Sequence, residues 1–295
     1  AFGGETALIV LGGLIMALGL VVPLSEVRKR TLMGRLKRAR STSRRDVRVD
    51  GRLVVDEKRL VLHAEGDKLR RILIDGGLLS RAHERYEHRP QQIEMAEAID
   101  AAMRGRRPLI VEAATGTGKT LAYLIPALMS KRRVVVSTGT KALQGQLFEK
   151  DLPFLHEHWP EPFETVQLKG RRNYLCKLKF EEMRRQPRFR NPEDVNKWPD
   201  IVRWAEQTET GDRAEVEGLP DDYSTWNELT VGSDACLGSD CEHFETCFVF
   251  EQRRRAQDAD VIVVNHHLFF ADLALRDQGI TELLPEYDAV VFDEA

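Results

Sequence analysis

Four short apolar runs mark the chain from its first third to its end, and small or polar residues follow each of them. The runs cover residues 108–111, 134–136, 261–264 and 289–292. Unbroken stretches rich in Val and Ile are typical of parallel strands that are covered on both faces of a sheet. Strands that alternate with helix-compatible segments indicate an α/β fold. We therefore expect an α/β domain built on a parallel sheet.

A longer apolar run lies near the start of the chain. Residues 6–24 carry no charge, and a strongly basic segment follows them. About 20 such apolar residues are enough to span a bilayer, and the basic flank predicts that the rest of the chain lies on the cytoplasmic side. A membrane helix over residues 6–24 is one prediction; a buried core helix, or an artefact upstream of the true start, is the alternative. Further along, residues 49–66 predict a β-hairpin and residues 67–79 a short amphipathic helix.

The residues after the first run have the pattern of a phosphate-binding loop. Residues 112–120 read E-A-A-T-G-T-G-K-T and stand between an apolar strand and an apolar helix. Glycines let backbone N–H groups close around phosphates, and the N-terminus of the helix adds a positive dipole end. Lys119 is expected to reach the β- and γ-phosphates, and the Thr120 hydroxyl to bind Mg²⁺. The pattern departs from G-x-x-x-x-G-K-[ST] at its first position, which is Ala113. The predicted nucleotide-binding residues are Ala114, Thr115, Gly116, Thr117, Gly118, Lys119 and Thr120.

Two other stretches predict further parts of an ATP site. The last apolar run leads into Asp293 and Glu294, which is the pattern of a Walker B strand. Asp293 is expected to hold Mg²⁺ through water, and Glu294 to act as the general base on the attacking water. Upstream of the loop, Arg89 and Gln92 stand in an R-P-x-Q pattern that resembles the adenine-reading element of superfamily-2 ATPases. An amide such as that of Gln92 can both donate to and accept from an adenine edge.

All four cysteines lie in one region between these two elements. Cys176 stands apart, and Cys236, Cys241 and Cys247 form a compact trio. Thiolates are soft ligands, and four of them suit a [4Fe–4S] cluster or a tetrahedral zinc ion. The C-x₂-C spacing typical of zinc sites is absent from the sequence, so that a cluster closing an inserted loop is the favoured interpretation. Four unrelated buried thiols are the alternative. Cysteines in a chain with an ATP loop indicate a reducing, intracellular setting, and the net charge of -3 points to no partner.

The combination of motifs resembles the XPD/DinG family of iron–sulfur superfamily-2 DNA helicases, closest to its bacterial DinG/YoaA type. The resemblance runs from about residue 86 to residue 295 and includes the P-loop, the cysteine set, N-H-x-L at residues 265–268 and the start of a DEAH box. It implies a RecA-like motor domain with a mostly helical [4Fe–4S] insertion. The implied segments are a membrane helix with its basic flank (1–30), a linker (31–80), the first part of the motor (81–165), the insertion (166–256) and the rest of the motor (257–295).

The resemblance also implies function. ATP and Mg²⁺ are the expected ligands of the motor, and hydrolysis is expected to drive 5′→3′ translocation on single-stranded DNA and the unwinding of duplexes, forks or R-loops in repair or replication. The protein is expected to be monomeric and cytoplasmic, tethered to the inner face of the membrane if residues 6–24 span it. Because the chain ends inside the DEAH box and lacks a second motor domain, we expect this fragment to bind nucleotide weakly and to be inactive by itself.

Two rival functions remain open at this point. A membrane transport ATPase would account for the run at 6–24 together with the P-loop, but the L-S-G-G-Q signature of ABC-type transporters is absent between the two ATP-site elements. A zinc-bearing nucleic-acid-binding P-loop ATPase without unwinding activity would account for the cysteines, and His243 would then be able to replace a sulfur ligand.

Overall fold

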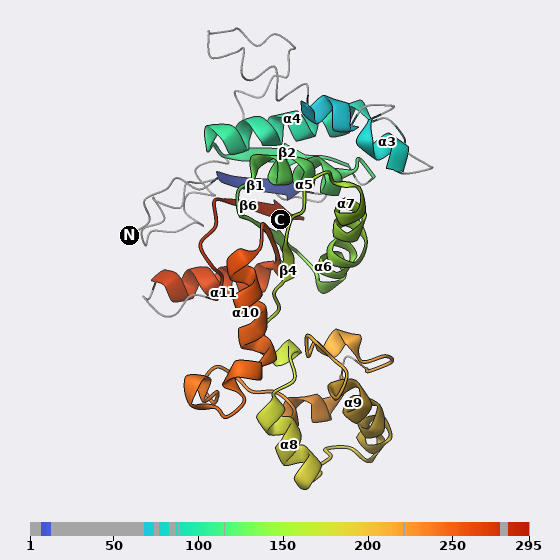
Figure 1. The fold of residues 1–295 in the computed structure, drawn as a ribbon, viewed down its shortest axis with the longest axis vertical. Coiled ribbons are helices and arrows are strands. Elements are labelled where there is room, and N and C mark those ends of the chain that lie inside the picture. Colours follow the sequence, from blue (N-terminus) through green and yellow to red (C-terminus); the bar gives the residue numbers. More distant parts are fainter. Residues whose placement is uncertain are drawn as a thin grey trace. The chain divides into compact units, whose positions relative to one another are not determined.

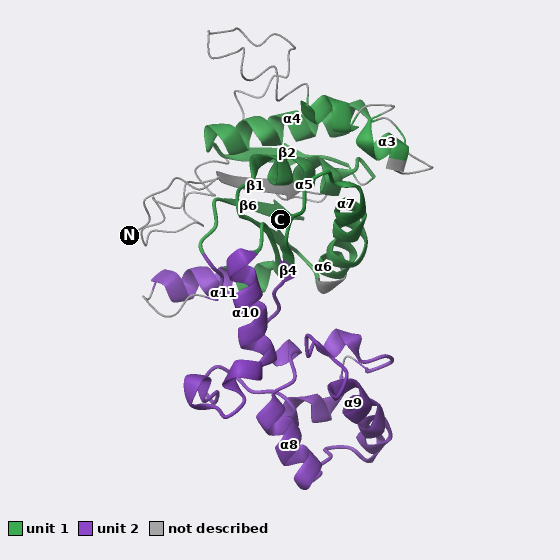
Figure 2. Cartoon of the chain, viewed as in Figure 1, with its two compact units in different colours: residues 1–165, 259–269, 286–295 green, residues 166–258, 270–285 purple. Residues whose placement is uncertain are grey.

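The computed structural model describes residues 7–12, 68–73, 77–82, 87, 89–114, 116–220, 222–277 and 283–294 of the 295-residue chain, with residues 7–12 described by their backbone. The chain divides into two compact units (Figure 2). Unit 1 comprises residues 1–165, 259–269 and 286–295, and unit 2 comprises residues 166–258 and 270–285. Residues 270–285 thus group with unit 2, whereas the sequence analysis assigned them to the motor.

Unit 1 is built on a six-stranded sheet in the order β2-β1-β6-β3-β5-β4 (Figure 1). The strands are β1 (Ala7–Gly12), β2 (Leu109–Glu112), β3 (Val134–Thr138), β4 (Thr165–Gln167), β5 (Val261–Asn265) and β6 (Ala289–Asp293). The pairs β1–β2, β1–β6, β3–β5 and β3–β6 are all parallel. Parallel strands need crossover connections, which here contain helices. The predicted α/β fold with a parallel sheet is confirmed.

Both faces of this sheet are buried. Val134 and Val136 of β3, with their neighbours on β5 and β6, belong to one apolar cluster with α5, while Val135 and Ile262 point to the opposite face and are also inaccessible to solvent. Burial on both faces explains why these strands are unbroken apolar runs rather than alternating ones.

Helices of unit 1 connect these strands. They are α3 (Leu78–Ala82), α4 (Pro90–Gly105), α5 (Lys119–Ser130), α6 (Lys141–Gln146), the π-helical turn η2 (Leu147–Asp151), α7 (Leu152–His158) and the first turn of α11 (His266–Asp277). Pro90 opens α4, where its missing N–H costs nothing, and Arg106 ends it in the left-handed conformation. In α5, residues 122–128 are all buried, which places this helix in the core of the unit.

The predicted membrane helix over residues 6–24 is wrong for residues 7–12. These residues form β1, a parallel strand that pairs with β2 on one side and β6 on the other. A run of apolar and β-branched residues can satisfy its backbone in a sheet as well as in a helix, and here the sheet supplies the partners. In the part of the chain that the structure describes, no helix is long and apolar enough to cross a membrane. Residues 13–24 and the predicted hairpin at 49–66 lie outside the described residues.

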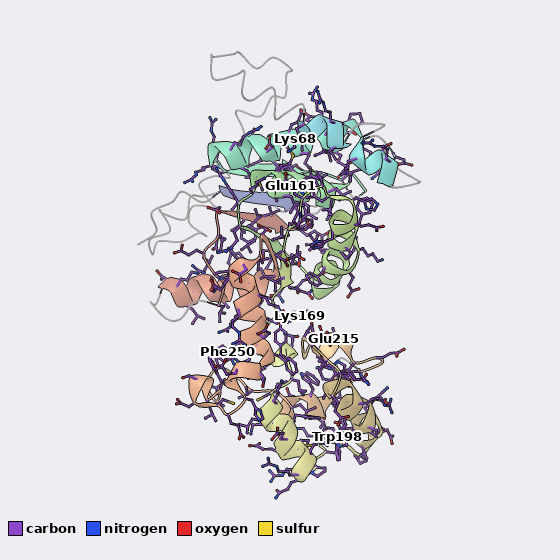
Figure 3. The ribbon with its side chains drawn as sticks, viewed as in Figure 1. Lys68, Glu161, Lys169, Trp198, Glu215 and Phe250 are labelled. Atoms are coloured by element: carbon purple, nitrogen blue, oxygen red, sulfur yellow. The ribbon has the colours of Figure 1, made fainter. Side chains whose placement is uncertain are left out.

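Unit 2 is made of short helices around an aromatic core. Its longer helices are α8 (Lys177–Arg185), α9 (Trp198–Ala205) and α10 (Phe248–Asp258), and its 3₁₀ turns are η3 (Arg171–Asn173), η4 (Pro192–Lys197), η5 (Arg213–Glu215), η6 (Ser224–Glu228), η7 (Gly238–Asp240) and η8 (Phe244–Thr246). The core contains Tyr174, Phe180, Tyr223, Trp226 and Phe248, with Trp198 packed against it (Figure 3).

One buried carboxylate links two turns of this unit. Asp194 on η4 accepts hydrogen bonds from the Thr225 backbone N–H at 3.0 Å, from the Ser224 hydroxyl at 3.0 Å and from the Thr225 hydroxyl. These donors lower the pKa of Asp194, and the hydrogen bond from the Thr225 hydroxyl has the largest effect. Hydrogen bonds to an ionised acceptor are stronger than neutral ones, so that Asp194 stabilises a unit with little regular secondary structure.

Candidate nucleotide and metal sites

The P-loop connects β2 to α5 through two glycines in a left-handed backbone conformation. Gly116 and Gly118 have φ angles of 81° and 79°, a region that residues with a Cβ rarely adopt. The Thr117 hydroxyl donates to the Ala114 carbonyl at 3.0 Å, and Lys119 Nζ donates to the Ala113 carbonyl at 3.3 Å. The loop is therefore closed on itself by its own side chains. Thr115 lies outside the described residues.

Two side chains of the R-P-x-Q pattern contact this loop. Arg89 Nη1 donates to the Gly116 carbonyl at 2.6 Å, and Gln92 Nε2 donates to the Gly118 carbonyl at 2.9 Å. Gln92 is 4% exposed, and the absence of a Cβ on Gly118 makes room for its amide. Helix α4 is thereby attached to the phosphate-binding loop. The adenine-reading role of Arg89 and Gln92 stays a prediction.

Asp293 stands at the carboxyl end of β6, on the same edge of the sheet as the P-loop. Its backbone pairs with Leu11 of β1 and Thr138 of β3. The side chain is 7% exposed; Oδ2 accepts a hydrogen bond from the Tyr123 hydroxyl at 3.1 Å, and Oδ1 is buried with no partner among the described residues. Burial and, less strongly, Glu294 raise the pKa of Asp293, whereas the Tyr123 hydrogen bond and the Lys119 charge lower it.

Glu294 and the P-loop lysine complete this edge. The Lys119 charge lowers the pKa of Asp293, and the register of β1 with β2 and β6 brings the end of β2, which leads into the P-loop, to the same edge of the sheet as Asp293. Glu294 is exposed and has a φ of 60°, which costs free energy in a residue with a Cβ and is frequent where side chains serve a site. The edge thus joins a cation, a hydroxyl and two carboxylates, a donor set that suits Mg²⁺ and a phosphate chain.

A second polar group lies at the ends of β3 and β5. His266 Nδ1 is 2.7 Å from the Ser137 hydroxyl, and its ring packs against Phe292 of β6 with the ring centres 5.7 Å apart. Burial lowers the pKa of His266. A Cβ on Gly139 would lie 3.3 Å from the Glu294 carbonyl. Three strand ends are therefore packed tightly around His266.

The four cysteines line one cavity in unit 2. Cys176, Cys236, Cys241 and Cys247 are all partly buried free thiols. Burial raises the pKa of Cys176, and the thiols of Cys247 and Cys241 raise it further, because ionised sulfurs close together repel. Around this cavity, Arg171 Nη1 donates to Cys236 Sγ at 3.1 Å. The structure therefore brings together the residues that the sequence placed in one set.

The spacing of the sulfurs bears on what they can hold. A tetrahedral zinc ion with Zn–S bonds of about 2.3 Å holds its sulfurs about 3.8 Å apart. Among the described residues, the group of His, Cys, Asp or Glu ligand atoms that all lie within 4.8 Å of one another is Glu181, Glu242 and His243. No three of the four cysteine sulfurs meet that limit, so the thiols as the structure places them do not form a tetrahedral zinc site.

Cationic side chains surround the same cavity. The guanidinium groups of Arg171 and Arg253 lie 5.4 Å and 5.8 Å from the centre of the Phe250 ring, which projects from the first turn of α10 (Figure 3). Burial lowers the pKa of Arg253, as does Arg171, whereas Cys236 and Cys247 raise it. Positive charge next to four sulfurs favours their ionised form, which is the form that binds metal.

Comparison with known proteins identifies the family. The DEAD/DEAH box helicase family matches residues 91–159. The chain is 43% identical over 222 residues to the ATP-dependent DNA helicase YoaA of Escherichia coli, a match covering 74% of this chain and 34% of that protein. These matches support a DinG/XPD-type helicase.

Other relatives agree with this assignment. The chain is 38% identical over 229 residues to the ATP-dependent helicase DinG of Mycobacterium tuberculosis, covering 69% of this chain and 33% of that protein. It is 33% identical over 215 residues to a protein named 3'-5' exonuclease DinG in Bacillus subtilis, covering 71% and 22%. The chain spans about a third, or less, of the length of these relatives. In a DEAH-box helicase, ATP and Mg²⁺ are the expected ligands of the edge formed by the P-loop and Asp293.

The sequence analysis missed two residues at this edge. Tyr123 bonds to Asp293 but reads as core in an apolar helix, although it lies four residues after Lys119 and hence on the same helical face. Asp151, at the end of η2, has its pKa raised to about 6, by burial first and by Asp293 second. No local pattern distinguishes Asp151 from an ordinary surface carboxylate.

Proposed function

We propose that this chain is the nucleotide-binding part of the motor of an ATP-dependent DNA helicase that carries a [4Fe–4S] cluster. The observation that carries the proposal is that the P-loop follows β2 and Asp293 ends β6 at the same carboxyl edge of a parallel sheet, with β1 paired to both strands. Ligands of open parallel sheets bind at the carboxyl ends of the strands. The names of the relatives support DNA as the nucleic acid and ATP as the nucleotide that is hydrolysed.

The chain's own residues divide the work at the ATP site. The N–H groups of the P-loop and the Lys119 ammonium hold the β- and γ-phosphates, since the start of α5 adds a positive dipole end. Thr120 and Asp293 would hold Mg²⁺, and the ion would supply positive charge against the phosphate oxygens. Glu294 orients the attacking water and accepts its proton. Arg89 and Gln92 contact the adenine from the end of α4 that already touches the loop.

The cysteine cavity of unit 2 is the proposed cluster site. Four thiolates in one cavity, spaced too widely for one zinc ion and faced by Arg171 and Arg253, suit a [4Fe–4S] cluster. Such a cluster supplies four metal–sulfur bonds that connect Cys176 to the distant trio. The residues between them pack around a small aromatic core, and the thiolate ligands would stabilise this loop-rich unit.

The same proposal covers the activity of the whole protein on DNA. We propose translocation on single-stranded DNA in the 5′→3′ direction and unwinding of duplex, forked or R-loop substrates, by a monomer. The resemblance to the family supports the direction, and the relatives named DNA helicase support the substrate class. Gly139 and Thr140, which follow β3 and are exposed, and the half-buried His266 after β5 are the residues proposed to pass DNA contact to the ATP site.

Nucleotide binding by this chain provides the test. A fluorescent ATP analogue is titrated into the wild type, into Lys119→Ala and into Lys131→Ala, whose lysine stands at the other end of α5 and forms an exposed ion pair with Glu161. We expect Lys119→Ala to weaken binding at least about tenfold, or ~1.4 kcal/mol, and Lys131→Ala to leave it unchanged. A wild type that binds no nucleotide, or equal binding by all three proteins, would overturn the proposed ATP site.

A further inference from the structure

Tyr123 is a buried phenol in the middle of the proposed ATP site. It is 0% exposed and lies on α5, three residues after Thr120 and four after Lys119. Residues three and four apart lie on the same face of a helix. The Tyr123 ring is therefore directed to the side of α5 that faces the end of β6, where its hydroxyl meets Asp293.

The hydroxyl of Tyr123 holds one of the two residues that are proposed to bind Mg²⁺. It donates to Asp293 Oδ2 at 3.1 Å. A phenol has one proton to donate, and here the carboxylate receives it. The other proposed ligand, Thr120, stands three residues before Tyr123 on α5.

This hydrogen bond decides which lone pairs of Asp293 are left for a metal. Asp293 Oδ1 is buried and has no hydrogen-bond partner among the described residues. A buried acceptor without a partner costs free energy, and a cation with its water shell is the partner that the chemistry of this oxygen suits.

Other groups that face the phenol and the carboxylate strengthen the argument. Asp151 at the end of η2 acts on both Tyr123 and Asp293 through its negative charge, and Lys119 and Glu294 act on Asp293. Two carboxylates at close range repel each other. A neutral donor on Oδ2 keeps Asp293 in place against that repulsion while no metal is bound.

We propose that Tyr123 is a positioning residue that aims Asp293 Oδ1 at the metal position and thereby sets the affinity for nucleotide-bound Mg²⁺. The proposal rests on the proposed function, because the metal belongs to the ATP site. Tyr123 itself contacts neither metal nor nucleotide. Its effect is therefore confined to the part of nucleotide binding that depends on the metal.

Replacing Tyr123→Phe removes the hydroxyl and keeps the ring. The control is Tyr223→Phe, since Tyr223 is a buried tyrosine of unit 2 whose hydroxyl donates to the Asp194 carbonyl at 3.0 Å. Affinity for the fluorescent ATP analogue is measured in excess Mg²⁺ and in EDTA. Binding of Mn²⁺ in the presence of ADP is followed by the loss of the free Mn²⁺ signal in electron paramagnetic resonance.

We expect Tyr123→Phe to weaken Mn²⁺ binding about tenfold, which is the loss of one charge-assisted hydrogen bond, and to reduce the gain in nucleotide affinity that Mg²⁺ gives. Affinity in EDTA should match the wild type, and Tyr223→Phe should match it under every condition. Equal weakening with Mg²⁺ and in EDTA would mean that the hydroxyl only supports the fold, and would overturn the proposal. A wild type that binds nucleotide without any effect of Mg²⁺ would overturn it too, whereas a wild type that binds no nucleotide would contradict the proposed function itself.

Discussion

Alanine at Gly118 should destabilise unit 1 much more than alanine at Gly116, although the two glycines have nearly the same backbone conformation. Their φ angles are 79° and 81°. A Cβ in this left-handed region costs roughly 1–2 kcal/mol. Replacing glycine also reduces the conformational entropy of the unfolded chain, which stabilises the fold by about 0.4–1 kcal/mol. Gly116→Ala should therefore cost about 1 kcal/mol, because nothing lies within 4 Å of its added Cβ.

At Gly118 the added Cβ meets the amide of Gln92. It would lie 2.8 Å from Gln92 Cδ and closer still to Nε2, so this amide has to move. The move breaks the 2.9 Å hydrogen bond to the Gly118 carbonyl and leaves the buried Gln92 amide without that acceptor. An unsatisfied buried polar group costs about 1–3 kcal/mol. Gly118→Ala should therefore cost about 3 kcal/mol, roughly 2 kcal/mol more than its neighbour.

Urea unfolding followed by far-ultraviolet circular dichroism measures both costs. The double variant Gln92→Ala/Gly118→Ala is compared with Gln92→Ala alone, because without the amide only the backbone cost of about 1 kcal/mol should remain. If Gly116→Ala and Gly118→Ala unfold at the same urea concentration, or if removal of Gln92 restores nothing, the reasoning about the crowded loop is refuted.

Three further variants test other parts of the structure. Asp151→Asn should raise the unfolding temperature in EDTA at pH 8 and leave it unchanged near pH 4. The pKa of Asp151 is about 6 in the folded chain against an ordinary value of 3.8, so its ionisation destabilises the fold increasingly as the pH rises between these values. An equal gain at both pH values would contradict this. Cys241→Ser should abolish the visible absorption of anaerobically purified protein, whereas Ser239→Ala, an exposed neighbour, should keep it; colour that survives in Cys241→Ser would refute the ligand assignment. Gly211→Ala should destabilise unit 2 by several kcal/mol and lower its iron content. The φ angle of Gly211 is 68°, and an added Cβ would lie 2.9 Å from Phe248 Cε2 and nearer to other atoms of that ring. Wild-type stability would contradict this, because it would show that the ring moves aside freely.

Local patterns predicted the sheet well and its neighbours less well. The runs that became β2, β3, β5 and β6 carry their signal in four or five consecutive residues, and the P-loop carries its own in spacing. Residues 7–12 were predicted as part of a membrane helix because an apolar run indicates burial but does not indicate whether lipid or protein buries it. Their partners, β2 and β6, lie about 100 and about 280 residues further along the chain.

The site divides in the same way. Residue types and spacing were enough to select Lys119, Asp293 and the four cysteines. Tyr123 was not selected, because its contact with Asp293 spans 170 residues and an aromatic residue in an apolar helix is most often simply core. Asp151 required knowledge of burial, which depends on the packing of η2 against α5 rather than on any motif.

The strand at residues 7–12 separates the two halves of the ATP site. β2, which leads into the P-loop, and β6, which ends at Asp293, each hydrogen-bond to β1 and not to each other. The height of the phosphate loop relative to the metal-binding carboxylate is thus set by how a third strand aligns with both: Leu11 stands opposite Val111 on one side and Asp293 on the other. A shift of one residue along either ladder would displace the two halves by about 3.3 Å, more than the length of a metal–oxygen bond. A segment without any chemistry of its own therefore acts as the spacer that keeps a lysine in reach of the phosphates and an aspartate in reach of the metal that those phosphates carry.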